Sequence, residues 1–257
     1  MNEPTIDISI IVLAYMEAGI IADSLQQLAS WLKSHDYGTV EVLVVTAEST
    51  DGTGKIAQSQ ASLFEHFRLI NAGPRVGKGR DCRLGMFEAR GRYRLFMDAD
   101  LATPLRHLDD VKAFMDRNGQ VGIAVRNLFS IHKGLARKLM SKTANVAAQI
   151  LVVPGIKDTQ CGFKVFEAKA AEAIFSRITL LSWSFDLEVL GIARQLGYKI
   201  DYFEAPDWKD PKAAGQGLVG DSQLKIVIKG FMDPFKIRLN IWAGRYRKPS
   251  YVHKPMY

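Results

Sequence analysis

Short apolar runs alternate with segments of helical periodicity along the first half of this chain, and this alternation constrains the fold more than any other feature. The run Ile8–Ala14 is continuously apolar, and the following segment repeats Ile21, Leu25 and Leu28 at helical spacing. Strands separated by helices are typical of a mainly parallel sheet with helices on both faces. The predicted fold class is therefore α/β. The pattern predicts strands at 8–14, 40–45, 67–71 and 93–97 and helices at 18–34, 50–60 and 79–89.

The second half of the chain is less regular but continues the mixture of the two patterns. With 257 residues, of which 47% are hydrophobic, the chain can bury a sizeable core in one large domain or two small ones. We expect one main domain at 1–221 and a separate C-terminal segment at 222–257. Within the main domain, the pattern predicts strands at 121–125, 162–166 and 198–204 and helices at 105–117, 135–153, 168–175 and 185–196.

Two carboxylates follow the strand predicted at 93–97. Residues i and i+2 of a strand point to the same side, so Asp98 and Asp100 share one face where the strand ends. Carboxylate oxygens are the ligands that Mg²⁺ takes in proteins together with the phosphates of a substrate. Two aspartates before a Thr-Pro turn also occur as helix caps or solvated groups. Taken alone, the pair leaves both interpretations open.

Polar residues follow two other predicted strands as well. Glu17 comes shortly after the strand at 8–14, and the segment 46–51 follows the strand at 40–45. In sheets of this kind, ligands bind beyond the carboxyl ends of the strands. We therefore expect these segments and the aspartate pair to meet at one rim of the sheet, which strengthens the interpretation as a ligand site.

The formal net charge of +7 is compatible with nucleic acid, an anionic membrane or a phosphorylated substrate as a partner. The basic residues lack zinc-finger spacing and an aromatic and basic RNA-binding signature, which argues against nucleic acid. No apolar run approaches the ~20 residues of a membrane helix, and no leader pattern is present at the N-terminus. Two cysteines do not imply a disulfide framework. We therefore expect a cytoplasmic protein.

Six short motifs occur in a specific order along the chain. They are Ala14-Tyr15-Met16-Glu17, Ser49-Thr50-Asp51-Gly52-Thr53, Gly77-Lys78-Gly79, Phe96-Met97-Asp98-Ala99-Asp100, Asp158-Thr159-Gln160-Cys161-Gly162-Phe163-Lys164 and Trp183-Ser184-Phe185-Asp186-Leu187-Glu188. In this order and spacing, most of the chain resembles the family 2 glycosyltransferases with the GT-A fold. The last two motifs resemble those of the dolichyl-phosphate and polyprenyl-phosphate glucosyl- and mannosyltransferases.

The resemblance implies a GT-A catalytic domain at 1–221, built on a mainly parallel central sheet flanked by helices. It implies transfer of a hexose, with inversion, from a nucleotide sugar (UDP-glucose or GDP-mannose) to polyprenyl or dolichyl phosphate. The implied cofactor is Mg²⁺ or Mn²⁺. An enzyme of this kind is expected to work peripherally on the cytoplasmic face of a membrane.

The donor site that the resemblance implies draws on several of the motifs. Asp98 and Asp100 hold the metal ion, and Asp100 also has a catalytic role. The remaining donor contacts are Ala14, Tyr15, Glu17, Lys78 and Ala99. Without the resemblance, Glu17 is equally an acid favoured at a helix N-terminus, and Lys78 a solvated turn between two glycines.

The implied acceptor site is more basic. The resemblance places the acceptor phosphate against Arg126, Ser130 and Arg137, and guanidinium groups match phosphate oxygens well. It gives Asp158 a catalytic or acceptor-orienting role. A solvated basic helix face and a capped turn are the alternative interpretations of these residues.

One segment departs from the family pattern. After its second strand the family usually has Asp-Asp-Gly-Ser, whereas this chain has Thr46-Ala47-Glu48-Ser49. A contact to the nucleotide base is therefore lost, moved to Glu48 or supplied by Thr46. The identity of the donor stays open at this point.

Two other functions remain as alternatives. A phosphate monoester has a second pKa of about 6 and is mostly dianionic at neutral pH, so it needs positioning rather than a strong base. A family 2 glycosyltransferase acting on a sugar or another hydroxyl group would need a base, for which Asp158, Asp186 or Glu188 are available. A nucleotide-sugar-binding protein without turnover is favoured only by the altered segment at 46–49.

The C-terminal segment is basic and amphipathic. It mixes apolar residues such as Phe235 and Trp242 with lysines and arginines, and Pro234 is expected to divide it into two short parts. A basic element with Trp and Phe can lie on an anionic membrane surface. Ordinary packing against the core is the alternative.

Overall fold

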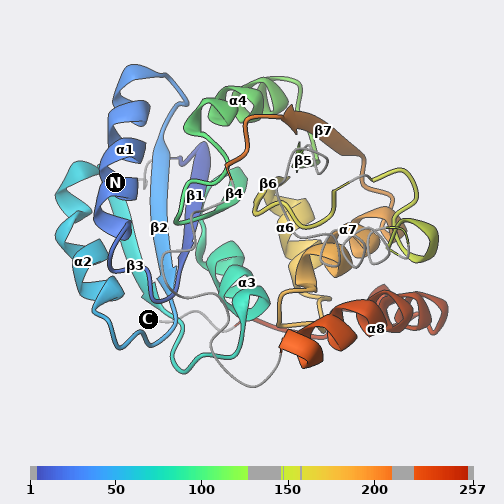
Figure 1. The fold of residues 1–257 in the computed structure, drawn as a ribbon. Coiled ribbons are helices and arrows are strands. Elements are labelled where there is room, and N and C mark those ends of the chain that lie inside the picture. Colours follow the sequence, from blue (N-terminus) through green and yellow to red (C-terminus); the bar gives the residue numbers. More distant parts are fainter. Residues whose placement is uncertain (1–4, 127–145, 147, 157, 210–222, 254–257) are drawn as a thin grey trace.

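The computed structural model of the chain describes residues 5–126, 146, 148–156, 158–209 and 223–253. Within these residues, seven strands form one sheet in the order β3-β2-β1-β4-β6-β5-β7 (Figure 1). β6 runs antiparallel to its neighbours β4 and β5, and the other pairs are parallel, so the sheet is mainly parallel as predicted. The strands are β1 (Ile8–Ala14), β2 (Val40–Thr46), β3 (His66–Asn71), β4 (Tyr93–Asp98), β5 (Val121–Arg126), β6 (Phe163–Glu167) and β7 (Ile200–Ala205).

The helices follow the predicted order, with ends that differ by a few residues. The helix predicted at 135–153 lies largely outside the described residues. The described helices are α1 (Ile21–Ser34), α2 (Thr53–Ser59), α3 (Lys78–Glu88), α4 (Leu108–Asp116), α6 (Ala168–Phe175), α7 (Phe185–Gln195) and α8 (Gln223–Trp242), with short 3₁₀ helices η1 (Ala61–Leu63), η2 (Leu105–His107) and η3 (Arg245–Arg247).

The side chains of β1 fill two separate cores, one on each face of the sheet. Ile8, Ile10 and Val12 pack with α1, α2 and α4. Ile11 and Leu13 pack with α3, α6 and α7 on the other face. Figure 1 shows these helices flanking the sheet. Because both faces of β1 are covered, its sequence is continuously apolar rather than alternating.

The carboxyl ends of the central parallel strands meet at one rim of the sheet. Ala14 pairs with Thr46, and Leu13 pairs with Asp98. Since β6 runs antiparallel to β4, it begins at this rim, with Phe163 opposite Met97 in β4. The turn before β6 is thereby placed next to the aspartates.

Helix α8 packs against α7 and continues through Pro234. The prediction that Pro234 divides this segment is therefore wrong. A proline removes one backbone hydrogen bond, but Pro234 and Ile237 are buried, so packing offsets the loss. Gly191 in α7 lies close to a different segment, because a Cβ there would lie 2.6 Å from Val152 Cγ1. Across the described ranges, none of the helices combines the length and apolar character needed to span a bilayer.

Candidate active site

Asp98 and Asp100 stand at the end of β4 in a turn of defined conformation. The Ala102 N–H donates to Asp100 Oδ1 at 3.0 Å. Leu101 adopts a left-handed conformation with φ of 51°, which is uncommon for a residue with a side chain. Both aspartates remain partly exposed. The turn therefore keeps two carboxylates at the rim, where a ligand can reach them.

The turn before β6 presses directly against Asp98. A Cβ atom on Gly162 would lie 2.0 Å from Asp98 Oδ2, so any side chain at this position would displace the Asp98 carboxylate. A small pocket beside the pair is lined in part by Asp98, Thr103, Gly162 and Trp208. Two of the sequence motifs, far apart along the chain, thus contribute to one site.

Lys78 begins α3 and contacts the aspartate pair. Its Nζ lies 2.6 Å from Asp98 Oδ1, and its side chain is only 12% exposed, so it does not sit on a solvated turn. Burial alone would lower the pKa of Lys78, but the charges of Asp98 and Asp186 outweigh burial and raise it above the usual value. Lys78 is therefore a stable cation beside the predicted metal ligands.

Glu17 brings a third carboxylate close to the pair. Burial and the charges of Asp100 and Asp98 raise the pKa of Glu17 to about 7. Within the described residues, no group of three or more His, Cys, Asp or Glu side chains is arranged to hold a metal ion by itself. Asp98 and Asp100 therefore fit a divalent cation that takes its other ligands from a substrate diphosphate and water, which is the usual mode for Mg²⁺.

The loops after β1 and β2 hold each other in place. Thr53 Oγ1 accepts a hydrogen bond from the Glu17 N–H at 2.8 Å, and Asp51 Oδ2 accepts one from the Ala18 N–H at 3.0 Å. The helix was predicted to begin at residue 18. These contacts keep residues 18–20 in a turn, so α1 begins at Ile21. The Ser49–Thr53 motif therefore shapes the loop that carries Glu17.

The other residues predicted to contact the donor lie at the same rim. Tyr15 is partly exposed, and the Arg75 guanidinium carbon lies 3.9 Å from the centre of its ring. Ala14 and Ala99 are buried, so their side chains do not face solvent. The structure thus brings all of the predicted donor residues to one edge of the sheet.

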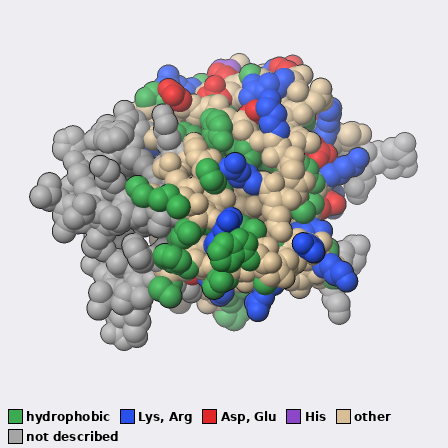
Figure 2. All heavy atoms as spheres, turned by 90° about the vertical axis from the view of Figure 1, so that its right-hand side faces the viewer, with side chains coloured by type: hydrophobic (Ala, Val, Ile, Leu, Met, Phe, Trp, Pro, Cys, Tyr) green, Lys and Arg blue, Asp and Glu red, His purple; other side chains and the backbone are tan. Residues whose placement is uncertain are grey.

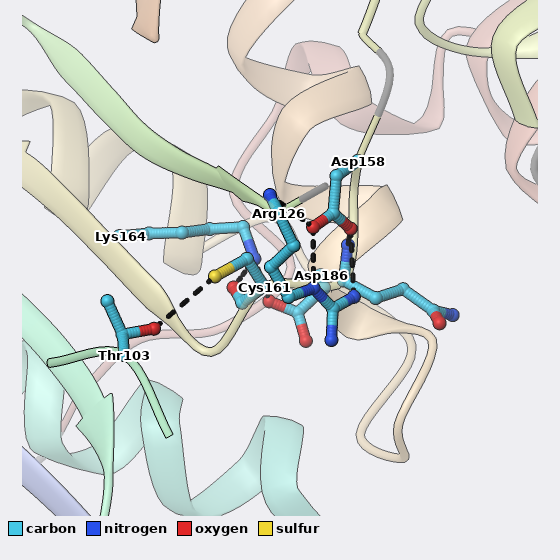
Figure 3. A network of polar contacts seen from close by, with 7 residues as sticks. Thr103, Arg126, Asp158, Cys161, Lys164 and Asp186 are labelled. Atoms are coloured by element: carbon cyan, nitrogen blue, oxygen red, sulfur yellow. Dashed lines mark hydrogen bonds and ion pairs between the residues drawn. The ribbon is translucent and has the colours of Figure 1, made fainter. Parts of the chain in front are cut away.

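Arg126, the last residue of β5, is paired with Asp158 (Figure 3). Arg126 Nε and Nη2 donate to the two carboxylate oxygens of Asp158 at 2.6 and 2.9 Å. Burial alone would raise the pKa of Asp158, but the hydrogen bonds and charge of Arg126 lower it. The Trp208 ring centre lies 4.9 Å from the guanidinium carbon. Asp158 is thus an ionised partner of Arg126, while Ser130 and Arg137 lie outside the described residues.

A second buried ion pair, Lys164 with Asp186, lies close to the first (Figure 3). Lys164 Nζ also donates to the Cys161 carbonyl at 2.5 Å. Burial raises the pKa of Asp186 against the opposing charges of Lys164 and Lys78. Both side chains of the pair are almost completely buried, so they tie the turn before β6 to α7 and do not face an acceptor.

Sequence reasoning missed Trp208 and Arg75. Trp208 follows β7, whose carboxyl end pairs with that of β5 at Arg126. An aromatic residue within a few residues of the end of a predicted strand was the signal available for it. Arg75 belongs to a basic cluster without periodicity and gave no comparable signal.

Comparisons with known proteins agree with this geometry. A sequence profile described as glycosyl transferase family 2 matches residues 9–175, more than half of the chain. Dolichyl-phosphate beta-glucosyltransferase ALG5D of Trichomonas vaginalis is 30% identical over 260 residues, covering 96% of this chain and 79% of that protein. Dolichyl-phosphate beta-glucosyltransferase of Saccharomyces cerevisiae is 30% identical over 271 residues, covering 96% of this chain and 78% of that protein.

The fold is shared with a solved enzyme structure. Glucosyl-3-phosphoglycerate synthase from Mycobacterium tuberculosis, solved with Mn²⁺, UDP and glucosyl-3-phosphoglycerate, matches 95% of this chain and 81% of its own with a TM-score of 0.64 and 16% identity. At this identity the likeness concerns the fold, and it confirms the predicted GT-A arrangement. The profile match and the relatives at 30% identity show that the chain belongs to glycosyltransferase family 2.

Proposed function

We propose that this protein transfers glucose from UDP-glucose to dolichyl or another polyprenyl phosphate, with inversion at the anomeric carbon. The observation that carries the proposal is the contact of Lys78 with Asp98, beside Asp100, at the carboxyl end of β4. The proposal of glucose and of a polyprenyl phosphate acceptor is supported by two relatives, each 30% identical over 96% of this chain, that are named dolichyl-phosphate beta-glucosyltransferases.

The donor diphosphate would lie against the aspartate pair and Lys78. Asp98 and Asp100 would hold Mg²⁺ or Mn²⁺, and the ion would supply positive charge to the departing nucleoside diphosphate. The solved structure with Mn²⁺ and UDP on a similar fold supports this proposal. Lys78 adds a second fixed positive charge at the place where negative charge develops during transfer.

The nucleoside would occupy the loops after β1 and β2. Thr46 is 4% exposed, whereas Glu48 is exposed at the rim. Of the two candidates for the contact that the usual acidic pair would make, Glu48 is therefore the one that can reach the nucleotide base. Glu17 and Tyr15 complete this side of the donor site.

The acceptor phosphate would bind opposite the donor, where Arg126 is oriented by Asp158. A phosphate monoester is already mostly dianionic at neutral pH, so it needs positioning and charge control rather than a base. Arg126 holds its fork in a fixed orientation through two hydrogen bonds to one carboxylate. Ser130 and Arg137 stay part of this proposal from the sequence.

Three carboxylates are candidates in the sequence for the base that a hydroxyl acceptor would need, and all three are engaged elsewhere. Asp158 is committed to Arg126, and Asp186 is buried against Lys164. Glu188 is fully buried. None of these three carboxylates is free to take a proton from an acceptor hydroxyl.

Helix α8 fits a membrane surface, which is where a polyprenyl phosphate resides. Exposed apolar residues recur along it at spacings of three and four, which places them on one stripe. Figure 2 shows hydrophobic side chains with lysines and arginines beside them on this side of the molecule. The stripe comprises Met232, Phe235, Leu239 and Trp242, which are 43–69% exposed.

The two cysteines are buried and unpaired, which fits the proposed cytoplasmic face.

The direct test is transfer of label from radiolabelled UDP-glucose or GDP-mannose to a short polyprenyl phosphate, with Mn²⁺ or with EDTA. We expect metal-dependent label in the lipid phase from UDP-glucose. Asp100→Asn should abolish it, whereas Asp116→Asn, on the exposed end of α4, should not.

The other outcomes separate the alternatives. Lipid label from GDP-mannose alone would correct the donor. Label on a soluble sugar without lipid label would favour the hydroxyl acceptor. No transfer from either donor, with nucleotide still bound, would favour a binding protein without turnover.

A further inference from the structure

Glu188 is a fully buried carboxylate for which the proposed reaction has no use. Its Oε1 accepts hydrogen bonds from Thr179 Oγ1 at 2.6 Å and from the Tyr246 hydroxyl at 2.7 Å. Its Oε2 accepts from the backbone N–H of Thr179 at 2.9 Å and from that of Leu180 at 2.7 Å. A carboxylate is tolerated in a core only when its oxygens are satisfied in this way. Glu188 therefore joins α7, the segment before it and the C-terminal part of the chain.

Tyr246 connects the C-terminal part of the chain to Glu188. It lies in η3, directly after α8, and is fully buried. Its hydroxyl accepts a hydrogen bond from Asn240 Nδ2 in α8 at 3.1 Å, and its carbonyl accepts one from Arg177 Nε at 2.9 Å. Burial and the charge of Glu188 raise the pKa of Tyr246, so its hydroxyl stays a donor.

The Gly77-Lys78-Gly79 turn packs on the segment that Glu188 holds. The Arg80 N–H donates to the Leu181 carbonyl at 3.3 Å. A Cβ on Gly77 would lie 2.4 Å from the Leu181 oxygen, and one on Gly79 would lie 2.9 Å from the Leu180 oxygen. The turn therefore rests closely on the backbone at 180–181, and any shift of that backbone moves the turn.

Lys78 is the functional residue of this turn. Besides its contact with Asp98, its Nζ lies 5.3 Å from the centre of the Trp183 ring, which belongs to the same held segment. A continuous set of contacts thus runs from Tyr246 through Glu188 and the segment 179–183 to Lys78.

We propose that Glu188 and Tyr246 are positioning residues that fix the 179–183 segment and so place Lys78 for the donor diphosphate. The inference rests on the proposed function in one respect, namely that Lys78 contacts the diphosphate. It goes beyond that function by giving α8 and η3, which lie outside the part matched by the family profile, a role in donor binding.

The test compares two buried tyrosine hydroxyls with the same pattern of partners. Tyr246→Phe removes the bond to Glu188. Tyr37→Phe is the matched control, because Tyr37 also donates to a carboxylate, Asp109, and accepts from a side-chain N–H, Trp31 Nε1. Tyr37 packs with α1 and α4 on the opposite face of the sheet. Both variants should lose similar amounts of thermal stability.

The readout is the affinity for UDP with Mn²⁺, measured by calorimetry, together with the kinetic constants. We expect UDP binding to weaken roughly 5-fold in Tyr246→Phe, the scale set by the loss of one buried hydrogen bond. The KM for the donor should rise by a similar factor, and kcat and the KM for the acceptor should change little. Tyr37→Phe should bind UDP like the wild type. Should Tyr246→Phe fold poorly, Thr179→Val offers a milder change, because it removes the hydrogen bond from Thr179 Oγ1 to Glu188 instead.

A double-mutant cycle separates positioning from a general loss of stability. If Tyr246 acts through Lys78, Tyr246→Phe should weaken UDP binding no further in a Lys78→Ala background. Equal UDP affinity in Tyr246→Phe and the wild type, or equal weakening with and without Lys78, would overturn the inference while leaving the proposed function intact. Failure of the wild type to bind UDP or GDP with metal would overturn the proposed function and the inference with it.

Discussion

Charged side chains at the candidate site occur in close pairs, and the geometry of each pair decides what it can do. Lys78 with Asp98 is a point contact that a diphosphate can share. Arg126 with Asp158 is a two-pronged contact that fixes the plane of a guanidinium group. A fixed guanidinium plane is useful for orienting a phosphate that attacks along one line.

Arg126→Lys keeps the positive charge but loses the planar fork, and we expect this change to lower kcat. Lysine is a point charge on a flexible stem and does not reproduce the two parallel hydrogen bonds to Asp158. A loss of 10- to 100-fold in kcat corresponds to roughly 1.4–2.7 kcal/mol of transition-state stabilisation. Initial rates of transfer to polyprenyl phosphate measure it, and UDP affinity should stay unchanged.

Arg117→Lys is the matched control for that change. Arg117 is partly exposed and pairs with Asp201 at 3.5 Å, away from the rim, so its exchange for lysine should leave kcat unaltered. An undiminished kcat in Arg126→Lys would show that the guanidinium plane has no part in orienting the acceptor.

Individual site residues differ in how well the sequence predicts them. The position of Asp98 and Asp100 at the rim was predictable, because an apolar run marked the strand before them and the carboxyl ends of parallel strands form the ligand-binding edge. The pairing of Arg126 with Asp158 was not predictable, because it depends on β6 entering the sheet between β4 and β5. That strand order is set by long-range packing, on which local periodicity carries no information.

At the scale of elements, apolar periodicity predicted where strands and helices lie, but it did not predict that α8 continues through Pro234. Pro234 indicated a break, and the break is absent because buried contacts with α7 outweigh one missing hydrogen bond. The exposed stripe on the other side of α8 follows from this packing.

The stripe makes α8 the element on which membrane binding should depend. Leu239 is 60% exposed at its centre, and burying a leucine side chain contributes about 1.5–3 kcal/mol. Leu239→Glu should therefore reduce binding to vesicles of phosphatidylcholine and phosphatidylserine by about 10-fold or more, since 1.4 kcal/mol is tenfold. Co-sedimentation with the vesicles measures this.

Ser30→Glu adds the same negative charge on the exposed face of α1 and serves as the control. If both variants lose binding equally, charge alone governs the association. If neither loses binding, α8 does not contact the membrane. Transfer to a short, water-soluble polyprenyl phosphate should persist in Leu239→Glu, because the stripe lies outside the catalytic rim.

At the scale of the whole molecule, the proposed donor site links segments from distant parts of the chain. Glu17 follows β1, Lys78 begins α3 and Asp98 ends β4, while Gly162 closes the site from the turn before β6. A ligand that contacts all of them joins both halves of the sheet. Binding to the folded state alone must then stabilise the whole fold.

Mn²⁺ and UDP together should therefore raise the melting temperature more than either does alone. At a ligand concentration 100 times the Kd, the gain is about 2.7 kcal/mol, and at this chain length each kcal/mol corresponds to roughly 2–4 °C. The expected shift is thus about 5–10 °C, reversed by EDTA, and differential scanning fluorimetry measures it. Asp98→Asn should lose the metal-dependent part of its shift, and Asp116→Asn should retain it. A full shift in Asp98→Asn, or one that EDTA does not reverse, would mean that the metal does not bind through the pair at the end of β4.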